Sequence, residues 1–255
     1  MLFYGIMEHD SLARARLYEQ LARMGKVVVH PRRIELLDLL CQAERSVEAL
    51  AQATGMKITT TSAHLQVMRH ARLVETRRDG TRIFYRAASE EVCEFLSALN
   101  AVAHARLTEV DHTLRSFGAG AAATERVSRD ELLVRVEAGD VVVLDVRPAV
   151  EYSAGHLPGA RSVPLERLEA CLEELDPGVE IVAYCRGPLC LLAPEAVALL
   201  RSRGRRARCL EDGFPEWRRA GYPVAVGSGT ANEFDALRHL HRGCDPRRPS
   251  LAERQ

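Results

Sequence analysis

Two cysteines five positions apart carry the most reactive chemistry in this sequence. The stretch AYCRGPLC places Cys185 at the end of an apolar run, and Cys190 just before a helical pattern. Loop amides that lead into a helix N-terminus favour an anion, so we expect the pKa of Cys185 to be depressed. Arg186 adds a positive charge, and Gly187 lets the backbone wrap around the sulfur. Cys185 is therefore predicted to be a nucleophile at neutral pH.

The second thiol leaves three interpretations open. Cys190 is an inert buried side chain, a resolving thiol that attacks a persulfide on Cys185, or half of a soft-metal or arsenic site with Cys185. A loop that curls around Cys185 would bring the two α-carbons within the disulfide limit of about 7 Å. A phosphatase loop instead needs arginine after five intervening residues, where this chain has Leu191, so the sequence argues against phosphatase chemistry.

The elements around these thiols alternate between short apolar runs and helical segments. One buried-type strand, Val141 to Leu144, ends at Asp145 and Arg147, and a second, Glu180 to Tyr184, ends at Cys185. This alternation predicts an α/β unit with a doubly wound parallel sheet. Chemistry in such sheets gathers at the carboxyl ends of the strands, where Cys185 is expected to lie.

The first half of the chain has a different pattern, with helical periods followed by a hairpin. Residues 46–55 open with a serine cap and stop at a glycine, and residues 59–71 form a second amphipathic helix. Residues 74–86 then switch to period two around a turn at Asp79-Gly80. This order is typical of a mostly α, winged helix-turn-helix domain whose second helix enters the major groove of DNA.

A basic face accompanies this pattern, although the formal net charge of the whole chain is zero. A protein-binding module with a solvated basic hairpin is the alternative interpretation. The residues expected to contact DNA are Lys57, Thr59, Thr60, Ser62, His64, Gln66, Arg69, Arg77, Arg78 and Arg82.

The length and composition of the chain indicate a globular protein of two domains. A chain of 255 residues accommodates two domains, and 47% hydrophobic with 27% charged residues is ordinary for a globular protein. We predict a DNA-binding and dimerisation domain over residues 1–117, a linker over 118–125, a second domain over 126–226 and a tail over 227–255. No apolar run approaches a membrane span, so we expect a cytoplasmic protein with no membrane partner. Seven cysteines without framework spacing indicate reduced thiols, with Cys41 and Cys93 as small core residues.

The first half resembles ArsR/SmtB-type winged-helix repressors. The resemblance covers residues 10–116 and rests on KVVVHPRRIELLDLL, the helix pair, LVETRRDGTRIFYR and a closing helix from about 89 to 116. It implies a homodimer, built by the first and last helices, that binds an inverted-repeat operator. The cysteine pair that some members use for metal sensing is absent from residues 47–50, and His104 and His112 do not reproduce the family's ligand spacing. We expect no metal and no cofactor; a site at His104 and His112 is the alternative.

The second half closely resembles a rhodanese domain over about residues 125–226. Three motifs occur in the family's order: LDVRPAVEYSAGHLPGARSVPL, VAYCRGPLC and EDGFPEWRRAGYPV. The resemblance implies that Cys185 accepts a sulfane sulfur as a persulfide, and that Asp145, Arg147 and His156 are framework and rim positions. It implies a substrate-binding loop whose backbone amides cradle the transferred group, formed by Arg186, Gly187, Pro188, Leu189 and Leu191.

Three hypotheses about function follow. The first is a dimeric transcriptional regulator whose operator binding changes when Cys185 reacts with sulfane sulfur, an oxidant or a thiophilic species. The second is a sulfurtransferase that moves sulfur from thiosulfate or a persulfide to a thiol or cyanide and carries an independent DNA-binding domain. The third makes the rhodanese-like domain a scaffold without catalysis. Turnover separates the first two, because a sensor reacts once and an enzyme cycles.

Overall fold

The computed structural model describes residues 2–117 and 125–227, with side chains from Leu12 onward except at positions 111, 115 and 117. The chain divides into two compact units, residues 1–103 and 104–255. Most of the predicted linker and tail lies outside the described residues, so those boundaries stay predictions. No helix among the described residues is both long and apolar enough to cross a membrane.

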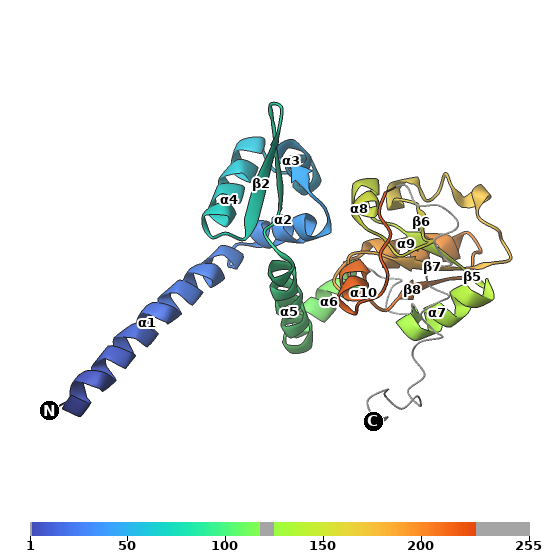
Figure 1. Ribbon diagram of the computed structural model, residues 1–255. Helices are drawn as coiled ribbons and strands as arrows, with labels where there is room; N and C mark the ends of the chain where they lie inside the picture. Colours follow the sequence, from blue (N-terminus) through green and yellow to red (C-terminus); the bar gives the residue numbers. More distant parts are fainter. Residues whose placement is uncertain (1, 118–124, 228–255) are drawn as a thin grey trace, which may run out of the picture. The chain divides into compact units, whose positions relative to one another are not determined.

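The N-terminal unit is mostly helical, with one small antiparallel sheet of order β1-β3-β2 (Figure 1). Its core gathers apolar side chains of the second to fifth helices, among them Leu36, Leu50, Leu65 and Leu96. The helices are α1 (Leu2–Val28), α2 (Pro31–Gln42), α3 (Val47–Thr54), α4 (Ile58–His70) and α5 (Glu90–Arg106), and the strands are β1 (Arg45–Ser46), β2 (Val74–Asp79) and β3 (Arg82–Ala87).

The predicted helix pair is confirmed. The Ser46 hydroxyl accepts a hydrogen bond from the Ala49 amide at the start of α3, and Gly55 ends that helix in the left-handed conformation, with φ of 65°. Leu65 and Met68 of α4 are fully buried, as the apolar period of this helix requires.

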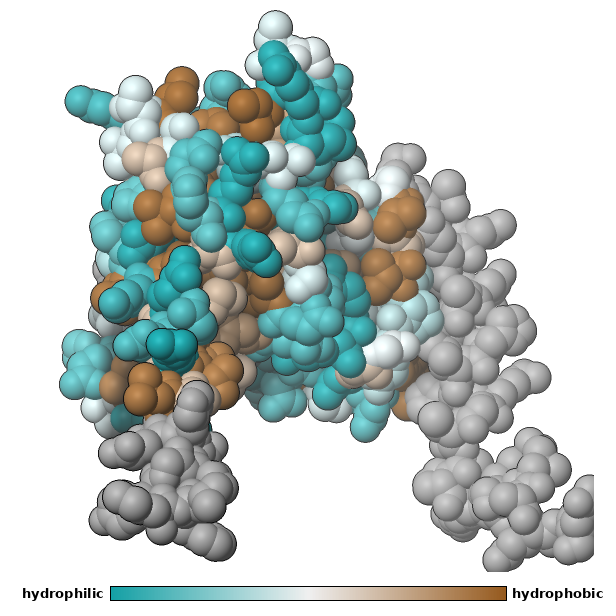
Figure 2. All heavy atoms as spheres, turned by 60° about the vertical axis from the view of Figure 1, so that its left-hand side comes forward, coloured by the Kyte–Doolittle hydropathy of each residue, from teal (hydrophilic) through white to brown (hydrophobic). Residues whose placement is uncertain are grey.

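The predicted hairpin is confirmed, but its turn is shifted by one position. Asp79 pairs with Arg82, so the two loop residues are Gly80 and Thr81, not Asp79 and Gly80. Gly80 has φ of 58°, which a side chain rarely adopts. The projection at the top of the view in Figure 2 carries mainly hydrophilic side chains, with hydrophobic ones beside it.

The closing helix expected over residues 89–116 is two helices instead. It breaks at Leu107 into α5 and α6 (Thr108–Phe117). His104 and His112 therefore lie on different helices, and the shared helix face that their spacing of eight suggested is not continuous.

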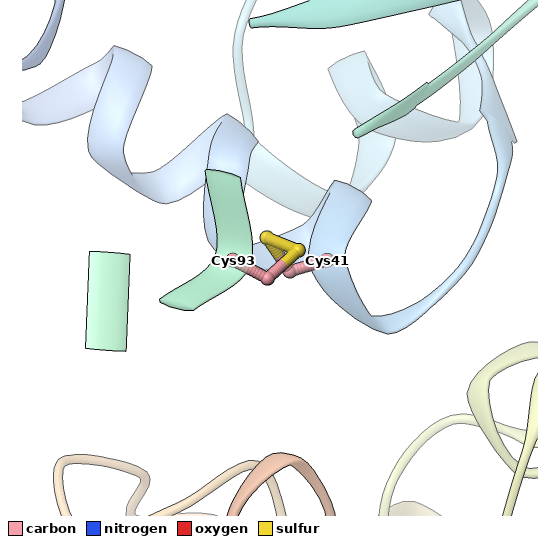
Figure 3. The surroundings of a disulfide bond; sticks show 2 residues. All are labelled: Cys41 and Cys93. Atoms are coloured by element: carbon pink, nitrogen blue, oxygen red, sulfur yellow. A yellow bond between two sulfur atoms is a disulfide. The ribbon is translucent and has the colours of Figure 1, made fainter. Parts of the chain in front are cut away.

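The expectation that Cys41 and Cys93 are separate core thiols is wrong, because they form a disulfide (Figure 3). Cys41 lies on α2 and Cys93 on the first turns of α5, 52 positions apart in sequence. Their α-carbons are 5.6 Å apart. Packing of α5 against α2 creates this proximity, which cysteine spacing alone cannot indicate.

The C-terminal unit contains the predicted parallel sheet, with strand order β4-β8-β7-β5-β6. Its strands are β4 (Arg126–Val127), β5 (Val141–Asp145), β6 (Arg161–Ser162), β7 (Glu180–Tyr184) and β8 (Ala207–Leu210). Its further helices are α7 (Arg129–Ala138), α8 (Ala149–Ala154), α9 (Leu192–Ser202) and α10 (Phe214–Arg219), with short 3-10 helices at Leu165–Arg167 and Leu172–Glu174.

Alternating strand residues build a core on each face of this sheet. Val182 of β7 packs into the core that contains Leu132 of α7 and Trp217 of α10. Its neighbour Ala183 packs into the other core, with Val197 of α9. Helices cover both faces, so the sheet is doubly wound. The central strand is β7, and Cys185 follows its carboxyl end.

Candidate functional site

Cys185 directly follows β7, and a buried hydrogen-bond network fixes the end of that strand. The Tyr184 hydroxyl donates to Asp145 at 2.6 Å and accepts from the Leu157 amide at 3.1 Å. Because Tyr184 is fully buried, this network holds the backbone one residue before the thiol.

Asp145 and Arg147 form a fully buried ion pair that supports the same network. The Arg147 guanidinium donates to both Asp145 carboxylate oxygens and, at 2.7 Å, to the Gly155 carbonyl. His156 is also buried and stacks on Tyr152 with ring centroids 3.6 Å apart. The framework role predicted for Asp145, Arg147 and His156 is confirmed; a rim position is wrong, since none of the three is exposed.

The loop after Cys185 is anchored by the segment that precedes α10. The Phe214 amide donates to the Cys185 carbonyl at 3.0 Å. A Cβ at Gly213 would lie 2.2 Å from the Gly187 nitrogen, so only glycine permits this approach. The Gly213 amide in turn donates to the Glu216 carboxylate at 3.0 Å.

The Cys185 thiol lies 3.7 Å from the Cys190 carbonyl oxygen and 3.9 Å from the Gly187 carbonyl oxygen. The two thiols of the loop influence each other, and their pKa values move apart. Burial, followed by the charge of the neighbouring Cys190, raises the pKa of Cys185 well above its usual range. The neighbouring Cys185 side chain lowers the pKa of Cys190 to about 7, with further help from the Arg186 charge. The expectation of a depressed pKa at Cys185 is wrong: the first proton leaves Cys190, and its negative charge then holds the second proton on Cys185.

Backbone amides serve both sulfurs, not Cys185 alone. The amides of Gly187 and Ala193 lower the pKa of Cys185, but less than burial raises it. The amides of Arg186 and Leu192 act on Cys190. Of these four donors, Leu192 and Ala193 lie beyond the predicted loop. They belong to the first turn of α9, whose free amides were the available signal.

The remaining loop residues have other surroundings. Pro188 is exposed, Leu189 and Leu191 are half-buried, and proline has no amide hydrogen to donate. The Arg186 guanidinium donates to both carboxylate oxygens of the buried Glu151, at 2.9 and 2.6 Å. Arg186 is therefore held in place as well as charged.

A pocket opens beside both thiols. The loop contributes Gly187 and Pro188, and more distant segments contribute Arg126, Cys209 and Asp212. Burial raises the pKa of Cys209 to about 11, so this third thiol stays protonated at neutral pH. The sequence interpretation missed these three residues, although the EDG motif that contains Asp212 was a signal for one of them.

The second candidate surface is the exposed side of α4 together with the hairpin. Lys57, Thr59, Thr60, Gln66 and Arg69 are exposed, as are Arg78 and Arg82 on the hairpin, whereas Ser62 is half-buried. His64 is half-buried against His30, with ring centroids 4.5 Å apart. The Gln66 amide nitrogen donates to the Tyr85 hydroxyl at 3.2 Å.

Arg77 differs from the other basic residues of this surface. Its guanidinium makes a salt bridge with Glu44 at 2.7 Å and a longer one with Asp79 at 3.4 Å. Both carboxylates hold the pKa of Arg77 above its usual value. Glu44 lies 33 positions away in sequence, so local charge counting overestimated the positive charge available here.

Two protein-family models match the chain. A model described as a bacterial regulatory protein of the arsR family matches residues 30–76, and a model of the rhodanese-like domain matches residues 128–220. The HTH-type transcriptional regulator Rv0324 of Mycobacterium tuberculosis is 46% identical over 222 residues, which cover 87% of this chain and 97% of that protein. The biofilm growth-associated repressor of Agrobacterium fabrum is 36% identical over 83 residues, 32% of this chain and 71% of that protein.

One similar solved structure covers the first unit. It is the solution NMR structure of the homodimeric winged helix-turn-helix DNA-binding domain, fragment 1–100, of Mb0332 from Mycobacterium bovis. The two sequences are 49% identical, and the match covers 37% of this chain and 87% of that chain with a TM-score of 0.36.

Proposed function

The chain belongs to the ArsR family of bacterial regulatory proteins and carries a rhodanese-like domain, and on that premise we propose a dimeric, DNA-binding transcriptional regulator that responds to sulfane sulfur. Cys185 and Cys190 receive the signal, and operator affinity is the output. The observation that carries the proposal is that Cys185 and Cys190 line the same pocket, with a pKa of about 7 at Cys190.

DNA binding is supported by the exposed residues of α4 and the hairpin. Thr59, Thr60 and Arg69 project from a helix whose opposite side, Leu65 and Met68, is buried in the core. Such a helix presents its polar face to base edges in the major groove. Arg78 and Arg82 supply charge for phosphate contacts, whereas Arg77 is neutralised by Glu44.

Dimerisation is supported by an uncovered apolar stripe on α1. Leu17, Leu21 and Met24 follow helical spacing and are 64%, 65% and 40% exposed, and Tyr18 beside them is 63% exposed. Large apolar side chains on one face of a helix indicate an interface. A second copy of the chain fits, because a two-fold dimer matches an inverted-repeat operator.

The sulfur chemistry follows from the shared proton of the thiol pair. Cys190 takes the proton from Cys185, and the Cys185 thiolate attacks the outer sulfur of a persulfide RSSH. The S–S bond of the donor breaks, RS⁻ leaves, and Cys185 carries the SSH group. Cys190 passes its proton to RS⁻, attacks the inner sulfur and expels HS⁻, which leaves a Cys185–Cys190 disulfide.

Regulation requires that the protein with reduced thiols and the protein with modified Cys185 bind the operator with different affinities. The test uses an operator duplex selected from a random pool with the reduced, full-length protein. Its Kd is measured before and after treatment with glutathione persulfide, with the mass of the intact protein recorded. The variants are Cys185→Ser and Cys190→Ser, with Cys171→Ser as the matched control at a half-buried free thiol.

We expect a change in Kd of about fivefold or more, which Cys185→Ser abolishes and Cys171→Ser retains. If Cys185 gains sulfur and the Kd for the operator stays the same, the proposed sensor function is refuted. Repeated release of sulfide from each chain in that case would identify a sulfurtransferase with an independent DNA-binding domain.

A further inference from the structure

The pocket beside the two thiols holds a positive charge that the sulfur chemistry proposed above does not use. Arg126 of β4 lines this pocket together with Cys185 and Cys190. Its guanidinium donates to the Glu211 carbonyl at 3.3 Å, and it forms no salt bridge with a carboxylate of the described residues. Because Arg126 is exposed, a ligand that enters the pocket can reach its guanidinium.

The pairing of three neighbouring strands places Arg126 on the same side of the sheet as the thiols. Arg126 of β4 pairs with Cys209 of β8, and Cys209 pairs with Ala183 of β7, two residues before Cys185. Paired residues of parallel strands share a face of the sheet, as do residues two positions apart on one strand. Ala183, Cys185 and Cys209 accordingly pack into the same core. Burial raises the pKa of Cys209 and the Arg126 charge lowers it, so this charge acts inside the pocket.

The other charged groups near the thiols already have partners. The Arg186 guanidinium makes a salt bridge with the buried Glu151 at 2.6 Å. The Asp212 carboxylate, which also lines the pocket, makes a salt bridge with Arg129 at 2.7 Å. Arg126 is therefore the charge in this pocket that is best placed to bind an anionic ligand.

The position of this charge indicates which kind of anion fits. Arg126 lies two strands away from β7, so about 10 Å separates the two backbones at the usual strand spacing. Apolar residues line the same pocket, namely Pro188, Ala193, Pro194 and Leu210. A sulfur donor with a carbon skeleton between its sulfur and its negative charge matches this arrangement. Thiosulfate does not, because it carries its charge directly on the sulfur pair.

We propose that Arg126 selects organic persulfides that carry a carboxylate, by binding the carboxylate while the outer sulfur meets Cys185. This selection rests on the proposed function, since it names the sulfur donor for that site. The Cys185 thiolate bonds to the outer sulfur, and the S–S bond of the donor breaks. Its electron pair leaves with RS⁻, which takes up the proton that Cys185 gave away. Hydrogen bonds from the guanidinium to the carboxylate hold the donor during this step.

The experiment compares two donors that differ only in charge, the persulfides of 3-mercaptopropionate and of 3-mercaptopropionamide. Each is mixed with the reduced, full-length protein, and iodoacetamide stops the reaction. Peptide masses then give the rate at which Cys185 loses its free thiol. The variants are Arg126→Gln and Arg126→Lys. The matched control is Arg161→Gln, which changes an exposed arginine on β6, the opposite edge strand of the sheet.

We expect the carboxylate donor to react about tenfold more slowly with Arg126→Gln than with the unchanged protein. The amide donor should react with both proteins at the same rate. Arg126→Lys should retain part of the preference, Arg161→Gln should retain all of it, and added salt should reduce it.

Two results would overturn the selection and leave the proposed function intact. One is an unchanged rate for the carboxylate donor in Arg126→Gln. The other is an equal loss of rate with both donors, which would assign Arg126 a structural role. If Cys185 of the unchanged protein reacts with neither donor, the sulfur chemistry of the proposed function is refuted, and the selection with it.

Discussion

Burial and the interaction between the two thiols decide which sulfur of the AYCRGPLC loop carries the negative charge. Cys185 is 4% exposed, and burial disfavours its thiolate. Cys190 is half-buried, and the Cys185 side chain, the backbone amides of Arg186 and Leu192 and the Arg186 charge all lower its pKa. The thiolate therefore forms first at Cys190, and Cys185 becomes nucleophilic only when it gives up its proton.

This dependence gives a residue-scale prediction. Replacement of Cys185 by alanine removes the side chain that lowers the pKa of Cys190, so that pKa should rise toward the usual cysteine value of about 8.5. Alkylation of Cys190 at pH 7 should then be roughly tenfold slower, because only the thiolate reacts. The measurement is the rate of iodoacetamide labelling against pH, located by peptide mass. Cys171→Ala should change nothing, and an unchanged midpoint in Cys185→Ala would contradict the assignment.

Among the elements of the second unit, the contact between the 185–190 loop and the segment before α10 controls the site. Gly213 lies so close to Gly187 that a single methyl group must displace backbone. The loop that holds both thiols therefore depends on a residue 28 positions after Cys185.

Gly213→Ala should lower the free energy of unfolding by about 1–3 kcal/mol, the usual cost of overpacking. It should also move the Cys190 pKa, since the amides around that sulfur move with the loop. Urea unfolding can be followed through Trp217, the only tryptophan in the chain and a fully buried residue of this unit. Gly178→Ala is the control, because its Cβ would meet only the Asp176 side chain, at 3.3 Å. Equal stability of the two variants would refute the steric argument.

The disulfide between α2 and α5 gives a prediction for the first unit. It joins residues 52 positions apart, and the chain-entropy model assigns such a cross-link about 4 kcal/mol of stability. Reduction should lower the urea midpoint of the helical circular dichroism signal. The Trp217 transition serves as an internal reference in the same sample and should stay in place. In Cys93→Ser the reductant should have no effect on the helical signal; a shift there would assign the change to other thiols.

At the scale of the whole molecule, two units combine a DNA-reading surface with reactive sulfur. The proposed regulation depends on the dimer at this scale, since two copies of α4 would be needed to read an inverted-repeat operator. The apolar stripe of α1 is the described surface best suited to join those copies.

Leu17→Glu combined with Leu21→Glu should disrupt the dimer. Each leucine contributes about 1.5–3 kcal/mol when buried, so the double variant should weaken self-association by roughly 100-fold or more. Sedimentation velocity measures the association, and operator titration should show a parallel loss of affinity. The control is Glu19→Gln on an exposed position of the same helix. A double variant that remains dimeric would place the interface elsewhere.

The sequence by itself determined the two folds and the position of the reactive loop. Helix caps at Ser46 and Gly55, the glycine at position 80 and alternating apolar runs act over a few residues, and each was confirmed. Local rules also placed Cys185 after a central strand. They did not predict the break at Leu107. They also did not predict the exact loop of the hairpin, because the register of a turn depends on pairing along the whole strand.

Only the tertiary structure decided how charge and bonding are distributed. Glu44 neutralises Arg77 from 33 positions away, and Cys41 bonds to Cys93 from 52 positions away. Even for Cys185 and Cys190, burial and the backbone amides that donate to each sulfur decide which thiol ionises first. Such quantities depend on distances in space, since electrostatic and covalent contacts form between whichever groups the packing of helices and strands brings together.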